Sequence, residues 1–169
     1  DLLYGLRHGE IDVLIGALRE PAPIEDIEQI PLFDDPLSVV ARVGHPLFAR
    51  KKIGEDDLMA YPWVVSPPGA PTRAYFERMF SPEARANLPG LIETSSLVMM
   101  RGALLRGDRL TLISTNQIVM EQELGLLAPL PVKTPGSARR IGLTVRRGWR
   151  PTATHEALLA HIRAACPQA

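Results

Sequence analysis

Cysteine is almost absent from the 169-residue sequence, which contains only Cys166. An intrachain disulfide is therefore impossible, and a reducing compartment is allowed. No apolar run is long enough to cross a bilayer, and no charged-then-apolar leader of the signal-peptide type is present. The sequence begins with Asp1 rather than Met, so we expect a fragment or a processed chain. These features favour a cytoplasmic protein that does not contact a membrane.

Net charge is also lacking, because 19 Lys and Arg residues balance 19 Asp and Glu residues. A surface that binds nucleic acid needs an excess of cations. We therefore expect any DNA binding to reside in another segment of a longer protein. Hydrophobic residues make up 46% of the chain and charged residues 22%, which is typical of a soluble globular protein with one domain or two small lobes.

Motifs that announce catalysis or cofactor binding are missing. The chain has no GxGxxG, P-loop or GxSxG pattern. Its histidines, which lack the spacing of metal ligands, are His8, His45, His155 and His161. The sequence therefore predicts no catalytic residues, no metal site and no cofactor, and a protein that is not an enzyme.

Three strand–helix units follow one another in the middle of the chain. Apolar patterning predicts strands at Tyr61–Ser66, Leu91–Thr94 and Leu110–Ser114, followed by helices at Thr72–Phe80, Ser96–Arg106 and Thr115–Leu124. Short connections between such units imply a mostly parallel sheet with helices on both faces. The predicted fold class is α/β.

The flanking segments are predicted from punctuation by glycine and proline. Before the central units we expect a helix over Leu2–His8, a strand over Ile11–Ile15, a loop leading into a strand over Ile24–Phe33, a turn at Asp34, Asp35 and Pro36, a strand over Leu37–Val43 and a helix over Gly54–Met59. After them we expect a strand over Leu126–Leu130, a loop over Pro131–Ser137, a strand over Arg139–Arg146 and a helix that begins at Pro151 and Thr152.

Small polar residues fill the junction between strand and helix in each central unit. The carboxyl ends of parallel strands meet at one edge of a sheet, where open α/β sheets bind ligands. Helix starts there offer free N–H groups to an anion, hydroxyls add donors and acceptors, and Arg73 adds a clamp for a carboxylate. The expected effector-binding residues are Ser66, Pro67, Gly69, Thr72, Arg73, Thr94, Ser95, Ser96, Ser114 and Thr115.

A simpler interpretation of the same residues is that they only cap helices. Ser, Thr and Asn are preferred at helix N-caps, where each contributes about 1 kcal/mol. Any one of these positions is explained well by capping, and Arg73 by an exposed helix position. The binding hypothesis rests on the occurrence of three such junctions in consecutive units.

Several segments, in this order and spacing, resemble the regulatory domain of LysR-type transcriptional regulators. They are Leu3 to Gly16, Leu32 to Arg42 followed by Gly44-His45-Pro46-Leu47, Tyr61-Pro62-Trp63 within Leu58 to Val65, Gly107 to Ser114, and Gly125 to Pro131. The resemblance covers nearly the whole chain. Each segment alone is weakly specific, and the series together is more so.

The resemblance implies a two-lobed α/β fold of the periplasmic-binding-protein type. It divides the chain into residues 1–43 of the first lobe, 44–140 of the second lobe and 141–169 returning to the first, with crossovers near Val40–Pro46 and Arg139–Val145. The family's winged helix-turn-helix, linker helix and first strand and helix are absent from this sequence, so the first lobe is incomplete.

What the family does with this fold gives the functional expectation. A small polar or anionic effector (an organic acid, sugar or aromatic acid) would bind between the lobes of a dimer or tetramer and control DNA binding by the absent domain. Gly44 and Gly142 fit the role of hinges, although local turns or packing explain them as well.

Two alternatives remain open from the sequence. The first is a periplasmic solute-binding protein of the same fold, which a leader upstream would support and an upstream winged helix-turn-helix would exclude. The second is a small α/β enzyme such as a dehydratase or deaminase, which the lack of a convergent catalytic set disfavours.

Overall fold

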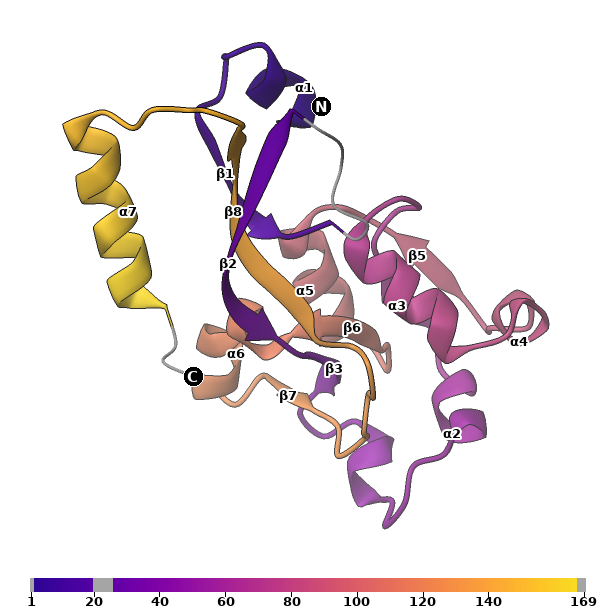
Figure 1. The fold of residues 1–169 in the computed structure, drawn as a ribbon. Helices are drawn as coiled ribbons and strands as arrows, with labels where there is room; N and C mark the ends of the chain where they lie inside the picture. The colour runs from indigo at the N-terminus through magenta and orange to yellow at the C-terminus, as the bar shows by residue number, and fades with distance from the viewer. Residues whose placement is uncertain (1, 20–25, 167–169) are drawn as a thin grey trace. The chain divides into compact units, whose positions relative to one another are not determined.

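Two units, each with its own sheet, make up residues 2–19 and 26–166, which are described by a computed structural model (Figure 1). The first unit contains the described residues of Asp1–Asp35 and Ala138–Ala169, and the second contains Pro36–Ser137. The sequence placed this boundary at residue 44 instead of 36. The difference arises because β3 (Leu37–Arg42) pairs with strands of the second unit.

The first unit is built on an antiparallel sheet of three strands. Its order is β1 (Val13–Ala17), β8 (Arg139–Arg146) and β2 (Ile27–Asp35), so β8 lies in the centre. Two helices accompany the sheet, α1 (Leu2–Arg7) and α7 (Ala153–Ala165). A small apolar cluster forms where Leu3 and Leu6 of α1 pack with Ile27.

Strand β2 corrects two sequence predictions. The segment Ile24–Phe33, expected to be a loop leading into a strand, and the expected turn at Asp34 and Asp35 form one nine-residue strand from Ile27 onward. Residues 24 and 25 lie outside the described residues. Proline and acidic residues usually count against a strand. Here the ladder with β8 shifts register between Pro31 and Phe33, and Asp35 pairs with Arg139 across the ladder at 2.8 Å.

The second unit contains the predicted parallel strands. Strand β4 (Trp63–Val65) pairs in parallel with β5 (Leu91–Glu93), and a parallel bridge from Trp63 to Leu110 joins β4 to the start of β6 (Thr111–Ser114). Strand β3 runs antiparallel between β6 and β7 (Leu127–Pro129). The mostly parallel sheet predicted from the sequence is therefore wrong in part. Only β4 and β5 form a parallel ladder, a single parallel bridge links β4 to the residue before β6, and the three-stranded sheet β6-β3-β7 is antiparallel.

Helices cover both faces of this sheet, as predicted. On one face Trp63, Leu110 and Leu112 pack with Phe76 and Phe80 and with the segments around α2 (Glu55–Met59) and α3 (Pro71–Met79). The other face packs against α5 (Leu97–Leu105), and its buried members are Val40, Val64, Met100, Leu104, Ile113, Ile118 and Leu127.

Short helices account for the remaining differences from the predictions. The expected helix over 115–124 is divided into a 3-10 turn (Thr115–Gln117) and α6 (Val119–Glu123), because Ile118 leaves the helical region at φ −129°. Helix α4 (Pro82–Ala86) was not predicted, although Ser81 caps it and Pro82 occupies its first turn. A 3-10 turn at Pro46–Ala49 was also missed.

The two glycines expected to act as hinges have local explanations. Gly44 adopts φ +80° in the turn after β3, a conformation that favours glycine. Gly142 lies inside β8, where an added Cβ would stand 2.3 Å from the carbonyl oxygen of Ile30. Neither glycine lies where the chain passes between the units, at Asp35–Pro36 and Ser137–Ala138.

Candidate functional site

The three polar junctions leave the same edge of the second unit's sheet. Val65 pairs with Glu93 at the ends of β4 and β5, and the N–H of Thr94 donates to the carbonyl of Val65 at 2.9 Å. Strand β6 lies on the other side of β4 in parallel and ends at Ser114. The sequence argument correctly predicted this common edge.

The first junction is a closed loop between β4 and α3. The hydroxyl oxygens of Ser66 and Thr72 are 2.8 Å apart, so a hydrogen bond joins its two ends. Gly69 adopts φ +84°, which allows the turn that follows Pro67 and Pro68. Pro71 begins α3, and Ala70 at its N-cap has no side chain to accept from the first turn. Pro68, Gly69 and Pro71 are the exposed residues of this junction.

Arg73 is held by the protein itself. Its guanidinium donates to Glu77 at 2.8 Å, to the carbonyl of Ser66 at 3.2 Å and to Glu93 at the end of β5. The hydrogen bond to Glu93 is the first cause of a raised pKa of Arg73, and only 11% of its side chain is exposed. Since two carboxylates already neutralise this cation, the structure gives it a role in fastening α3 to the ends of β4 and β5.

The second and third junctions contain side chains used as caps. Thr94 accepts from the N–H of Ser96 at 3.0 Å, and Ser96 in turn accepts from the N–H of Met99 at 3.3 Å to cap α5. Ser114 is fully buried and accepts from the N–H of Asn116 at 3.1 Å. The capping interpretation therefore applies to these three residues, whether or not they also contact a ligand.

Two of the predicted residues have unused hydroxyl groups. Ser95 is exposed and Thr115 is half-buried, and neither hydroxyl hydrogen-bonds to any residue that the structure describes. They follow β5 and β6 at the edge where Ser66 follows β4. Together with the backbone of the first junction, they are the groups at this edge that remain available to a small polar molecule.

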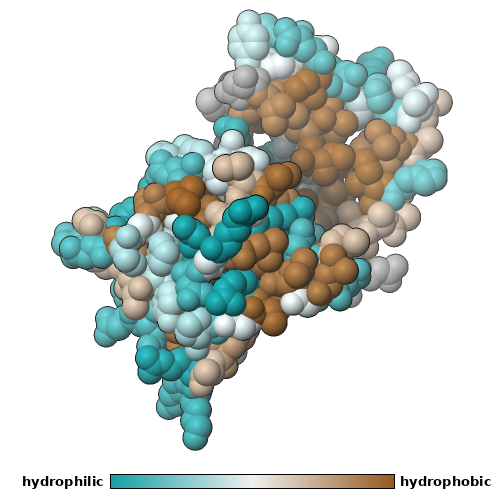
Figure 2. Space-filling view, turned by 180° about the vertical axis from the view of Figure 1, so that it is seen from behind, coloured by the Kyte–Doolittle hydropathy of each residue, from teal (hydrophilic) through white to brown (hydrophobic). Residues whose placement is uncertain are grey.

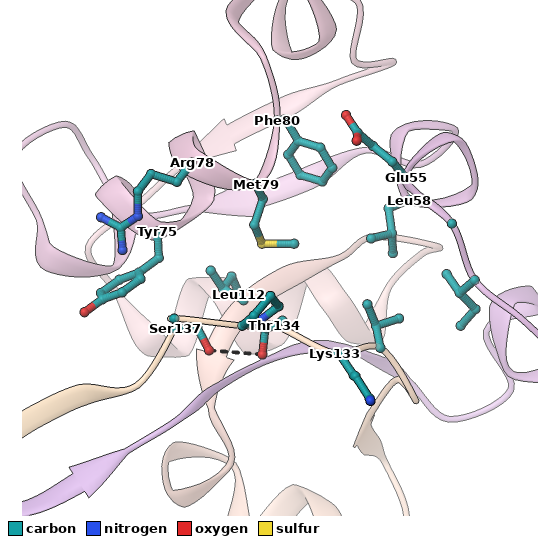
Figure 3. Close-up of a pocket in the computed structure, with 15 residues that line it drawn as sticks. Glu55, Leu58, Tyr75, Arg78, Met79, Phe80, Leu112, Lys133, Thr134 and Ser137 are labelled. Atoms are coloured by element: carbon teal, nitrogen blue, oxygen red, sulfur yellow. Dashed lines mark hydrogen bonds between the residues drawn. The ribbon is translucent and has the colours of Figure 1, made fainter.

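A cavity of about 400 Å³ lies elsewhere in the second unit, and sequence reasoning missed it (Figure 3). It opens between α3, the segment around α2 and the loop from Val132 to Ser137, and Leu112 of β6 contributes to its lining. None of the ten predicted effector-binding residues lines it. The only signal in the sequence was the proline- and glycine-rich loop itself, which was assigned to a connection.

Within residues 2–19 and 26–166, no three His, Cys, Asp or Glu side chains are grouped so that they could hold a metal ion. In the same residues, no helix has the length and apolarity needed to span a bilayer.

Comparison with known proteins decides the family. Residues 1–167 match the model of the LysR substrate binding domain. The chain belongs to this family. It is 34% identical to the HTH-type transcriptional regulator GalR of Pseudomonas putida over 158 residues, which are 94% of this chain and 40% of GalR. It is 30% identical to the regulator PcaQ of Agrobacterium fabrum, with 97% of this chain and 53% of PcaQ covered.

Solved structures confirm the two-lobed α/β fold of the LysR substrate-binding domains. The regulatory domain of Synechocystis CcmR, solved with 2-PG, superimposes with a TM-score of 0.78 at 22% identity and covers 99% of this chain and 79% of its own. The effector binding domain of QuiR, solved with shikimate, superimposes with a TM-score of 0.71 at 20% identity. The match covers 94% of this chain and 73% of the QuiR chain. The LysR resemblance drawn from the sequence is therefore confirmed, and the solute-binding and enzyme alternatives gain no support.

Proposed function

We propose that this LysR effector-binding domain binds a small hydroxylated carboxylic acid at the strand-end edge of its second unit. The observation that carries the proposal is the gathering of three strand–helix junctions at one edge, with the hydroxyls of Ser95 and Thr115 unused. Because Arg73 is already paired with Glu77 and Glu93, the carboxylate would depend on backbone N–H groups at the helix starts. The effector binding domain of QuiR, solved with shikimate, supports an effector of this kind.

A thermal-shift and calorimetric test with shikimate and a panel of hydroxylated carboxylic acids addresses this proposal. At a ligand concentration of 100 Kd, binding stabilises the folded protein by about 2.7 kcal/mol. S95A and T115V should each weaken the best ligand about two- to tenfold, since each removes one hydrogen bond. S81A, which removes a cap on α4 in the same unit, is the matched control and should leave the affinity unchanged. A panel without binders, or equal effects of all three variants, would contradict the proposal.

The whole protein is proposed to be a cytoplasmic transcriptional regulator without enzymatic activity. The chain spans about half the length of its curated relatives, among which GalR, PcaQ and CbbR are named as HTH-type transcriptional regulators. DNA binding would belong to the part of such a regulator outside this domain, which agrees with the balanced charge of the chain. In a gel-shift assay we expect that this chain does not bind operator DNA and that the longer regulator does.

Self-association is proposed through the exposed apolar residues of α5 and α6. Apolar side chains gather in patches on the face shown in Figure 2. Val98 and Met99 of α5 and Met120 and Leu124 beside α6 are each more than half exposed. Large exposed apolar patches often mark protein–protein interfaces. Light scattering of the unsubstituted chain should show a dimer or tetramer, and M120K and L124K should dissociate it. L158K, on α7 of the first unit, is the control and should leave the oligomer intact. A monomeric unsubstituted chain would refute the proposal.

A further inference from the structure

The geometry points to a second ligand site, the cavity on the α3 face of the second unit, which takes a carboxylate with an apolar body. The site is separate from the strand-end edge, and the inference does not depend on the function proposed there. Its volume of about 400 Å³ falls within the range of about 300–1,000 Å³ that is typical of small-molecule sites.

The inner wall of the cavity is apolar and comes from four parts of the unit. Leu58, Leu112 and Phe80 are buried core residues that also reach the cavity, and Met79 and Val132 are partly buried beside them. Figure 3 shows Leu58, Met79, Phe80 and Leu112 directed toward the same space. An apolar ligand group that displaces water from such a wall is stabilised in proportion to the apolar area that it buries.

The rim of the cavity carries two cations that the protein leaves without carboxylate partners. Arg78 and Lys133 are exposed, and neither forms an ion pair with a residue that the structure describes. The guanidinium of Arg78 lies over the ring of Tyr75, 4.3 Å from its centroid, which fixes its position beside the opening. Glu55 is the acidic residue of the lining, so the lining keeps a net positive charge.

This pairing of an apolar wall with a cationic rim selects the ligand class. A sugar would leave the apolar wall unused, and a purely apolar molecule would leave both cations without a partner. A carboxylate on an aromatic or branched aliphatic body satisfies both parts, because its anionic end forms charge-assisted hydrogen bonds with Arg78 or Lys133. At the strand-end edge, by contrast, Arg73 is already paired with Glu77 and Glu93.

Calorimetric titration of the whole chain with 4-phenylbutanoate tests the site, with 4-phenylbutan-1-ol as the uncharged probe. We expect the carboxylate to bind at least tenfold more tightly than the alcohol. R78Q or K133Q, both at exposed positions, should weaken carboxylate binding about five- to tenfold and leave alcohol binding unchanged. R106Q removes an exposed cation of the same unit that does not line the cavity, and it should have no effect.

Three results would overturn the inference. One is the absence of 4-phenylbutanoate binding at millimolar concentration. The second is equal affinity for the carboxylate and the alcohol. The third is carboxylate binding that S95A and T115V weaken while R78Q and K133Q do not, which would assign the ligand to the strand-end edge instead. If the inference about the cavity fails, the function proposed for the strand-end edge can still be tested separately with S95A and T115V.

Discussion

Replacing Gly142 with alanine should destabilise the first unit strongly. Gly142 lies in the central strand β8, with Gly16 of β1 on one side and Pro31 of β2 on the other. An added Cβ would stand 2.3 Å from the carbonyl oxygen of Ile30 and 2.9 Å from a methyl group of Leu18. The leucine side chain can rotate away, but the oxygen belongs to the backbone of the neighbouring strand.

The size of the effect follows from this contact. Real Cβ atoms essentially never approach another atom closer than 3.0 Å, so β2 must shift by about 0.7 Å, the difference between 3.0 and 2.3 Å. Overpacking of this kind costs about 1–3 kcal/mol. Gly16 is the matched control, because it faces Gly142 across the ladder and its added Cβ meets nothing within 4 Å. G16A should be neutral or should stabilise the protein by up to about 1 kcal/mol, since alanine restricts the unfolded chain.

Urea unfolding followed by far-ultraviolet circular dichroism measures both variants against the parent. The free energy of unfolding of G142A should be lower than that of G16A by about 1–4 kcal/mol, with an unchanged m-value. If the two variants were equally stable, the close approach of β2 to β8 would be wrong. A G142A protein as stable as the parent that failed only in regulation would instead restore the hinge role expected from the sequence.

Three further predictions concern the second unit. Burial lowers the pKa of His45 below its ordinary value of 6.5, so the contribution of the neutral ring to stability is fully present above pH 6.5. The free energy of unfolding should fall as the pH drops from 6.5 through the folded-state pKa, and this fall should be smaller in H45N. A double-mutant cycle of R73Q and E93Q should give a coupling free energy of about 0.5–1 kcal/mol in urea unfolding, because Glu93 is 42% exposed and solvent screens the pair. The buried hydroxyl of Thr111 donates to the carbonyl of Val64 at 2.7 Å. In thermal unfolding, T111V should therefore lower the free energy of unfolding by about 1–2 kcal/mol, and T111S, which keeps the hydroxyl, should lower it less.

The central strand–helix units were predictable because local and long-range signals agree there. The segments around Trp63, Leu91 and Leu112 are short and apolar, and each precedes a small polar residue and a helix. That pattern has few alternatives to parallel strands. The common edge of the three junctions followed from topology alone, and the pairing of Val65 with Glu93 agrees with it.

Three of the failures share one physical cause, which is a partner distant in the sequence. Strand β2 contains Pro31 and ends in two acidic residues, and only its pairing with β8 more than one hundred residues later makes it a strand. Arg73 was expected to be available to a ligand, and Glu93 occupies it. The cavity could not be predicted at all, because its wall joins residues of α2, α3, β6 and the loop before β8, whose proximity exists only in the folded unit.

The loop from Val132 to Ser137 belongs both to the cavity and to the path of the chain between the units. Val132 and Lys133 line the cavity, while Thr134 and Ser137 donate to the carbonyl of Leu37 at 2.6 and 3.1 Å. Leu37 is the second residue after the chain enters the second unit, and Ser137 is the last before it leaves. A ligand that moved this loop would have to stretch or break these hydrogen bonds, each contributing about 0.5–1.5 kcal/mol. A ligand in the cavity could therefore displace this loop only at the expense of its hydrogen bonds to Leu37, at the start of the second unit.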